Sequence, residues 1–333
     1  MPRFLVTGAA GFIGSSIVEA LLARVEQVRG LDNFATGKHK NIEPFLKQMD
    51  FHDADLRDYD AVLQACDSVD IIFHQGALPS VPRSVKDPRS SHASNIDGTF
   101  NLLEAARAAG VKRVVYAASS SAYGNQPGFP RVETMQPQPI APYPVQKLAG
   151  ELYMQSYWRV YGLETVCLRY FNIFGPRQDP ASPYSGVMAK FILQMLEGEM
   201  PTIQGDGEQA RDFTYIENAV QANLLAAAAP AEKIAGRVFN IACGERHTVN
   251  ETHSVIAKLL KFDKPAQYGP ARVGDVRTSH ADITAAREAF GYEPNVKFEE
   301  GLRRTVEWYK REREQDLQEI GQEWSKGRYR GCS

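Results

Sequence analysis

The sequence predicts an α/β fold in which helices cover both faces of a doubly wound parallel sheet, followed by a smaller mixed C-terminal lobe. Two observations predict this architecture. Strand-like and helix-like patterns alternate through the first half of the chain, and such alternation builds parallel sheets by right-handed crossovers. The first strand, at residues 4–6, runs through a glycine-rich turn into a helix. With 333 residues and 43% hydrophobic residues, the chain can form one large or two smaller domains around a sizeable core.

The glycine-rich turn has a specific spacing. Gly8, Gly11 and Gly14 stand three residues apart after the first strand, and Ile17 and Leu21 continue the apolar line of the next helix. Gly8 would allow a sharp turn, Gly11 would leave room for a pyrophosphate, and Gly14 would let helix and strand pack closely. The free N–H groups of the helix N-terminus would face the phosphates. The pattern therefore predicts a Rossmann-type site for a dinucleotide.

An acidic residue follows the second strand, at residues 28–31. Asp32 stands about 20 residues after the glycines, where a carboxylate is expected to hold the ribose hydroxyls of the adenosine. That carboxylate would repel a 2′-phosphate, and no arginine occurs in residues 33–37 to neutralise one. We therefore expect NAD rather than NADP.

The remaining strands of the first half are expected at 70–74 and 112–118, with a helix at 95–109 between them. In such sheets ligands bind beyond the carboxyl ends of the strands. The residues that follow the strands are therefore candidate site residues: Asp55, Leu56, Gln75, Gly76, Ala77, Ser119, Ser120, Ser121, Tyr170, Phe171 and Asn172.

After residue 172 the pattern changes. A proline-containing loop leads to a helix at 186–196 and a turn at 205–207, and a further strand is expected at 237–242. Short mixed elements continue to about residue 285, and a helical tail from residue 299 ends polar, with frayed last residues. We therefore expect a dinucleotide-binding domain at 1–172 and a substrate lobe at 173–333, with some segments of the lobe returning to the sheet.

Composition and charge narrow the class of protein. The net charge of −2 argues against nucleic-acid or membrane-surface binding, and no apolar run reaches the about 18 residues of a membrane span. No signal peptide is expected before the first strand. The four cysteines form no Cys-x-x-Cys pair, so no metal site is expected, and a reduced, cytoplasmic enzyme is the simplest interpretation.

A second group of residues indicates a catalytic site. Tyr143 and Lys147 stand four residues apart on a predicted helix, and so on one helix face. The pKa of tyrosine, near 10, is too high for a base at neutral pH, but a neighbouring ammonium and a positive nicotinamide ring would lower it. A hydroxyl from Ser119–Ser121 could hydrogen-bond the reacting alcohol. Glycines, strand-end serines and this Tyr–Lys pair, in that order, predict hydride chemistry on an alcohol.

These motifs resemble the extended short-chain dehydrogenase/reductase family, specifically its nucleotide-sugar 4-epimerases, and the middle of the chain is most similar to bacterial UDP-N-acetylhexosamine 4-epimerases. The similarity covers nearly the whole chain. It is carried by the segments TGAAGFIG (7–14), LDN (31–33), ADL (54–56), SSSAYG (119–124), PYPVQK (142–147), LRYFNIFGPRQ (168–178), GDGEQARDFTYI (205–216) and GDVRTSHADI (274–283).

The resemblance implies a role for each matching position. Tyr143 would be the base, Lys147 its partner and a ligand of the nicotinamide ribose, Ser119 the catalytic serine, and Ser120 a sugar contact. The implied NAD contacts are Gly8, Gly11, Phe12, Ile13, Gly14, Asp32, Asn33, Phe34, Gly37, Asp55, Leu56, Gln75, Gly76, Ala77, Asn95, Tyr143, Lys147 and Tyr170. The implied UDP-sugar contacts, besides the two serines, are Asn172, Val187, Lys190, Thr202, Ile203, Gln204, Arg211, Arg246, Arg272, Asp275 and Ser279.

The implied reaction is the inversion of carbon 4 of a UDP-sugar through a transient 4-keto sugar, by a homodimer that pairs through helices near 95–109 and 143–161. The resemblance implies that Ser279 stands where a tyrosine would confine the enzyme to glucose and galactose. A serine leaves space for an N-acetyl group, so we expect activity on UDP-GlcNAc and UDP-GalNAc, and also on UDP-Glc and UDP-Gal.

Three other functions share parts of this pattern. A 4,6-dehydratase needs an acidic pair where Ser120 and Ser121 stand, which argues against it. A UDP-glucuronate 4-epimerase has the same catalytic pattern and stays open. A non-catalytic NAD-sensing regulator of the same fold usually loses the tyrosine or the lysine, whereas both are present here.

Overall fold

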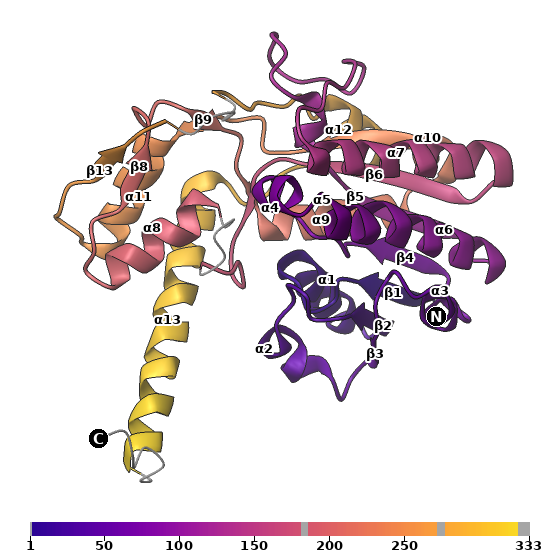
Figure 1. The fold of residues 1–333 in the computed structure, drawn as a ribbon, viewed down its shortest axis with the longest axis horizontal. Coiled ribbons are helices and arrows are strands. Elements are labelled where there is room, and N and C mark those ends of the chain that lie inside the picture. The colour runs from indigo at the N-terminus through magenta and orange to yellow at the C-terminus, as the bar shows by residue number, and fades with distance from the viewer. Residues whose placement is uncertain (1, 181–185, 272–276, 326–333) are drawn as a thin grey trace.

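A seven-stranded parallel sheet forms the centre of the molecule (Figure 1). The structure is a computed structural model that describes residues 2–180, 186–271 and 277–325, with side chains up to residue 318. The strand order is β11-β6-β5-β4-β1-β2-β3, and every neighbouring pair is parallel. The strands are β1 (Arg3–Thr7), β2 (Gln27–Asp32), β3 (Asp50–Asp53), β4 (Ile71–His74), β5 (Arg113–Ser119), β6 (Glu164–Tyr170) and β11 (Arg237–Ile241). The predicted doubly wound α/β fold is confirmed.

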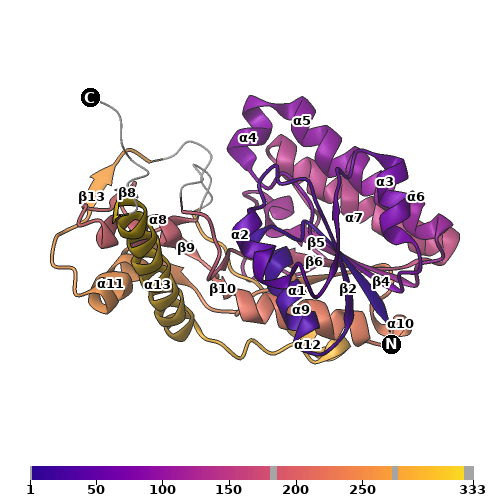
Figure 2. The same ribbon diagram turned by 90° about the horizontal axis from the view of Figure 1, so that it is seen from below.

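Helices cover both faces of this sheet (Figure 2). One face carries α3 (Tyr59–Cys66), α6 (Gly98–Ala108) and α7 (Pro142–Tyr161), and the other carries α1 (Phe12–Leu22), α9 (Ile216–Ala228) and α12 (Thr284–Phe290). Shorter helices follow the strand ends: α2 (His39–Ile42), η1 (Glu43–Phe45), α4 (Val81–Lys86), α5 (Pro88–His92), η2 (Ala93–Asp97), η3 (Ser120–Tyr123) and α10 (Ala231–Ile234).

The smaller lobe lies beside the carboxyl ends of the strands (Figure 1). It contains α8 (Val187–Leu196), α11 (Val249–Leu260) and the long α13 (Phe298–Ser325). Three two-stranded sheets complete it: β7 (Ile173–Phe174) with β10 (Thr214–Tyr215), β9 (Ala210–Arg211) with β12 (His247–Thr248), and β8 (Thr202–Gln204) with β13 (Gln267–Gly269). Because β11 follows residue 173 yet pairs with β6 at the edge of the large sheet, the second half of the chain contributes one of the seven strands.

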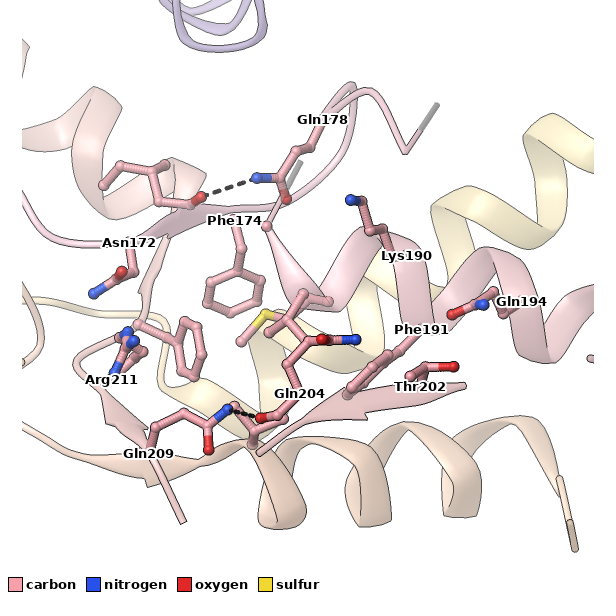
Figure 3. A pocket seen from close by; sticks show the side chains of 16 residues that line it. Asn172, Phe174, Gln178, Lys190, Phe191, Gln194, Thr202, Gln204, Gln209 and Arg211 are labelled. Carbon is pink, nitrogen blue, oxygen red and sulfur yellow. Dashed lines mark hydrogen bonds between the residues drawn. The ribbon is translucent and has the colours of Figure 1, made fainter. Parts of the chain in front are cut away.

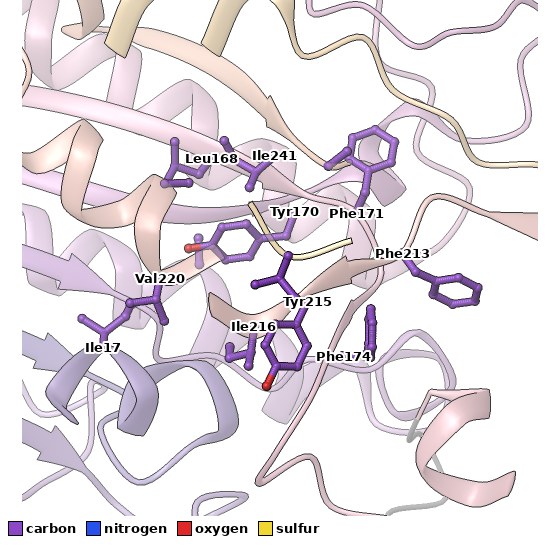
Figure 4. Close-up of a cluster of buried hydrophobic side chains, with 14 of the residues drawn as sticks. Ile17, Leu168, Tyr170, Phe171, Phe174, Phe213, Tyr215, Ile216, Val220 and Ile241 are labelled. Atoms are coloured by element: carbon purple, nitrogen blue, oxygen red, sulfur yellow. The ribbon is translucent and has the colours of Figure 1, made fainter. Parts of the chain in front are cut away.

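The core has two parts because the strands alternate their side chains between the two faces. On β1, Phe4 and Val6 pack with α1 and the smaller lobe, whereas Leu5 packs under α3 and α6. The first part continues without a break from Ile17 of α1 to the aromatic rings of the smaller lobe, such as Phe174 (Figure 4). This continuous packing fixes the lobe against the sheet.

Two buried arginines join strands to helix ends. Arg113, on β5, donates to the carbonyls of Ala226, Ala227 and Ala229 at the end of α9 and pairs with Glu164. Arg29, on β2, makes the same kind of contact with the carbonyls of residues 64, 65 and 67 after α3. Helix ends leave such carbonyls without intrahelical partners, so a buried cation there stabilises both the helix and its contact with the strand.

Candidate active site

A cavity of about 730 Å³ lies along the carboxyl ends of β1, β2, β4 and β5. The glycine turn forms its floor. Gly8 has a φ of +68°, and a Cβ atom there would lie 2.8 Å from the backbone nitrogen of Gly76. A Cβ atom on Gly14 would lie 2.0 Å from the carbonyl oxygen of Gly8. Only glycine fits these two positions, so backbone rather than side chains faces the cavity at the start of α1, as a pyrophosphate requires.

Asp32 closes the end of β2 beside this turn. Its carboxylate accepts hydrogen bonds from the backbone nitrogens of Ala10 (2.9 Å) and Phe34 (2.8 Å). Burial raises the pKa of Asp32, and these N–H groups oppose that effect. A Cβ atom on Gly37 would lie 2.9 Å from both carboxylate oxygens, so the 33–37 loop needs glycine to pass this close. The carboxylate is therefore held in place at the cavity wall.

The residues present fit an adenine dinucleotide along the whole cavity. A glycine-only cradle, a fixed carboxylate and a Tyr–Lys pair all line it, as the pyrophosphate, the adenosine ribose and the nicotinamide ribose would need. The predicted NAD contacts that line it are Gly8, Gly11, Phe12, Ile13, Gly14, Asp32, Asn33, Phe34, Gly37, Asp55, Leu56, Gln75, Gly76, Ala77, Tyr143, Lys147 and Tyr170.

Asn95 is placed differently from this prediction. It does not line the cavity, because the loop after β4 lies between its side chain and the cavity. It accepts from the backbone nitrogen of Leu78 (2.7 Å) and donates to Gln146 (2.8 Å). Asn95 thus holds the loop that forms the wall.

A buried histidine that sequence reasoning missed supports the same wall. His74 lies between Thr7 and Thr99, with Nδ1 2.8 Å from one hydroxyl and Nε2 3.0 Å from the other. Thr99 donates its own proton to the carbonyl of Asn95, so it must accept from Nε2–H. Thr7 accepts from the nitrogen of Gly76 and can donate to Nδ1. Burial lowers the pKa of His74 to about 3, which keeps this relay neutral.

Tyr143 and Lys147 lie on the same face of α7 at the cavity, where Lys147 is buried and Tyr143 is half-buried. Lys147 donates to the carbonyl of Ala117 (2.8 Å) and lies 4.8 Å from the centre of the Tyr116 ring. Burial raises the pKa of Tyr143 to about 12, and a hydrogen bond with Ser119 opposes it. Burial lowers the pKa of Lys147 to about 8.

These pKa values differ from the expectation that Lys147 lowers the pKa of Tyr143. The ammonium is directed at a backbone carbonyl, so the loss of water around the phenol outweighs it within the protein chain. Ser119 is also fixed locally, because its hydroxyl lies 2.8 Å from that of Ser121 and caps η3. Neither Ser119 nor Ser120 is among the lining residues of the cavity, although Ser119 contacts Tyr143.

A ring of three hydrogen bonds fixes the far side of the cavity. Asn223, from α9, donates to the hydroxyl of Tyr170 (2.7 Å). Tyr170 donates to Gln75 (3.2 Å), and Gln75 donates back to Asn223 (3.2 Å). Asn223 carries no sequence signal, because it lies on an apolar helix far from every motif.

A second cavity, of about 400 Å³, lies in the smaller lobe (Figure 3). Ile173, Gln178 and Gly186 line both cavities, so the two adjoin. The predicted UDP-sugar contacts that line the second cavity are Asn172, Val187, Lys190, Thr202, Gln204 and Arg211. Of the others, Ile203 is the buried middle residue of β8, and Arg246 is exposed. Arg272 and Asp275 lie outside the described residues.

Ser279 contacts this cavity through Asn172. The amide nitrogen of Asn172 donates to the hydroxyl of Ser279 (2.8 Å) and to the carbonyl of Asp212 (3.0 Å). Both of its protons are therefore used, and its oxygen, which has no partner among the residues that the structure describes, remains for a ligand. The buried Asp212 carboxylate accepts from the backbone of Cys243, Gly244 and Ala281, which ties the segment of Ser279 to β11.

Within the described residues, no helix is long and apolar enough to cross a membrane. No group of three His, Cys, Asp or Glu side chains there could hold a metal ion.

Residues 4–242 match the model of the NAD dependent epimerase/dehydratase family. The UDP-glucose 4-epimerase of Mycolicibacterium smegmatis is 39% identical over 92% of this chain and 98% of its own. The UDP-N-acetylglucosamine 4-epimerase of Methanobrevibacter ruminantium, solved with UDP-N-acetylmuramic acid, has a TM-score of 0.88 at 40% identity over 93% and 99% of the chains. The UDP-glucose 4-epimerase of Thermus thermophilus, solved with NAD, has a TM-score of 0.85 at 38% identity over 92% and 99%.

Proposed function

This chain belongs to the NAD dependent epimerase/dehydratase family, and we propose that it is a UDP-sugar 4-epimerase that accepts N-acetylated hexoses. One observation carries the proposal: the dinucleotide cavity and the smaller-lobe cavity share the wall formed by Ile173, Gln178 and Gly186. A nucleotide-sugar anchored in the lobe would therefore place its sugar beside Tyr143. A cofactor-binding regulator would not need a second cavity at this point.

The residues of the chain divide the chemical work. NAD, when bound, supplies the hydride acceptor and donor for carbon 4 of the sugar. Tyr143 would take the proton of the 4-hydroxyl and later return it, with Ser119 orienting that hydroxyl. Lys147 would hold the nicotinamide ribose and favour the phenolate as an ammonium.

The lobe would hold the part of the substrate that does not react. Arg211 lines the cavity with a planar guanidinium that suits diphosphate oxygens. Lys190, on α8, adds a second cation on the opposite wall (Figure 3). Val187, Thr202 and Gln204 would surround the uridine, with the buried Ile203 supporting them from β8. With UDP held in the lobe, the 4-keto sugar would be free to turn over and present its other face to the nicotinamide.

The sugar preference rests on Ser279. Its side chain is small, and its hydroxyl accepts from the amide of Asn172, which lines the lobe cavity. A larger residue there would occupy the space that an N-acetyl group needs. We therefore propose UDP-GlcNAc and UDP-GalNAc as substrates, together with UDP-Glc and UDP-Gal.

The test has two steps. The cofactor released from denatured protein is identified by enzymatic assay, and the protein is then incubated separately with UDP-GlcNAc, UDP-Glc and UDP-glucuronate. We expect NAD and the 4-epimers of the first two sugars. Tightly bound NADP, or epimerisation of UDP-glucuronate alone, would overturn the proposal.

We also propose a homodimer in the cytoplasm. Apolar side chains are exposed on the outer faces of α6 and α7: Phe100, Leu152, Tyr153, Val160 and Tyr161. Two copies of these helices would cover one another. The described cysteines Cys66, Cys167 and Cys243 are free and buried, as suits a reducing compartment.

A further inference from the structure

A buried ion pair lies one helical turn beyond Lys147. Glu151, on the same face of α7, is fully buried and receives both forks of Arg169 from β6, at 2.9 Å (Nε) and 2.6 Å (Nη2). This two-bonded geometry is that of an ionised carboxylate with a guanidinium. Arg169 is itself buried, and its third nitrogen, Nη1, has no hydrogen-bond partner among the described residues.

Such a pair is expensive for stability alone. Burying two charges removes their hydration, and their mutual attraction offsets this loss only in part. Proteins in which apolar residues replace such a pair are therefore often as stable. Arg113 and Glu164, by contrast, also hold the end of α9. Within the described part of the chain, Arg169 bonds no carbonyl at a helix end, and it lies over the ring of Tyr123, at 4.6 Å. The position of Glu151 next to Lys147 suggests another use.

The other groups around Lys147 carry no negative charge. From β4, His74 is neutral because burial lowers its pKa. Burial raises the pKa of the Tyr116 and Cys167 groups on β5 and β6, and of Tyr143 on α7. Among the described residues facing Lys147, Glu151 is thus the anion, and it opposes the effect of burial on the lysine.

We propose that Glu151 is a positioning residue that keeps the buried Lys147 in its ammonium form, and that Arg169 holds the carboxylate in place and shares its charge with Lys147. The inference rests on the proposed function only for the role of Lys147 toward the cofactor. Without the carboxylate, two buried cations would face one another. Without the guanidinium, the full negative charge of Glu151 would act on Lys147 and stabilise its ammonium form.

The two removals therefore have opposite signs. An opposite charge within about 4–6 Å shifts a pKa by about 1–3 units. E151Q should lower the pKa of Lys147, and R169Q should raise it. A general packing defect would move both variants in the same direction. E164Q is the matched control, since it breaks another Arg–Glu pair on β6 away from Lys147.

The first readout uses no substrate. The free energy of unfolding is measured against pH by urea titration. A lysine whose native pKa is below its unfolded pKa binds fewer protons when folded, so stability rises with pH between the two values. For the wild type this window runs from about 8 to about 10.4. The lower limit of this pH window should fall by at least about one unit in E151Q and rise in R169Q. It should be unchanged in E164Q, and the window should be absent in K147M.

The second readout is the alkaline limb of turnover on UDP-sugars, which should move with the same signs. If E151Q proves unfolded, E151D replaces it and should lower the window by a smaller amount. Equal or same-direction shifts in the Glu151 and Arg169 variants would overturn the proposal. Loss of the expected sugar activity alone would overturn the proposed function and leave the unfolding readout intact.

Discussion

At the scale of single residues, burial acts on Tyr143 and Lys147 in opposite senses. It raises the pKa of the phenol to about 12 and lowers that of the ammonium to about 8. Both shifts disfavour the ion pair that base catalysis needs. Within the chain, Ser119 opposes the rise in the pKa of Tyr143, and Glu151 opposes the fall in the pKa of Lys147. The positive charge of an oxidised nicotinamide would also lower the pKa of Tyr143.

Replacing Tyr143 by phenylalanine should lower turnover by at least about 10²-fold while cofactor and UDP-sugar binding stay near wild type. The ring keeps its packing and loses only the proton-carrying oxygen. Lys147→Ala should lower both turnover and retained cofactor. Y153F, on the exposed side of the same helix, is the control and should stay active. Wild-type turnover in Y143F would show that another group is the base.

Ser279→Tyr should abolish activity on the N-acetylated sugars and spare UDP-Glc and UDP-Gal, because a packed site has little free volume for a phenol. Kinetics on all four sugars measure this. S279A separates bulk from hydrogen bonding: it removes the contact with Asn172 but should keep the acetylated activities. An equal loss on all four sugars in S279Y would rule out a size gate.

At the scale of elements, α9 depends on a residue outside it. Arg113→Gln removes the donor for the carbonyls of Ala226, Ala227 and Ala229 and leaves Glu164 without its cation. We expect a loss of about 3 kcal/mol in urea unfolding. E164Q should cost less, since the carbonyl contacts remain. If the two variants cost the same, the helix end would not be the reason.

The elements with clear periodicity could be predicted from the sequence, and those without it could not. β1, α1 and β2 carry runs of apolar residues and a glycine turn, and the predicted ranges meet the observed ones within a few residues. The paired strands of the smaller lobe have only two or three residues, and β9 finds its partner β12 across a distant segment. Such short strands have no period to detect.

The same limit applies to the site. Residues in local motifs, such as the glycines, Tyr143 and Lys147, stand out in the sequence. His74 and Asn223 do not, because their partners come from elements far along the chain, and Arg169 lies in a motif that gives no sign of its buried partner Glu151. Asn95 could be picked out, but whether it faces the cavity or holds the loop in front of it depends on packing.

At the scale of the whole molecule, the proposed dimer depends on the outer faces of α6 and α7. Leu152→Glu should convert the proposed dimer into a monomer, since it would place two carboxylates in an apolar contact. Sedimentation equilibrium measures this. Leu46→Glu changes an exposed leucine elsewhere and should stay dimeric. A monomeric wild type, or a dimeric L152E, would exclude this face.

The junction between the two cavities is completed late in the synthesis of the chain. The carbonyl of Gln178 is bonded by the hydroxyl of Tyr309, which is synthesised 131 residues later. At about 5–20 residues per second, that delay is on the order of ten seconds. During the same interval the ring of Phe174 lacks its contact with Phe298. A nascent chain therefore exposes this aromatic surface until α13 has been synthesised.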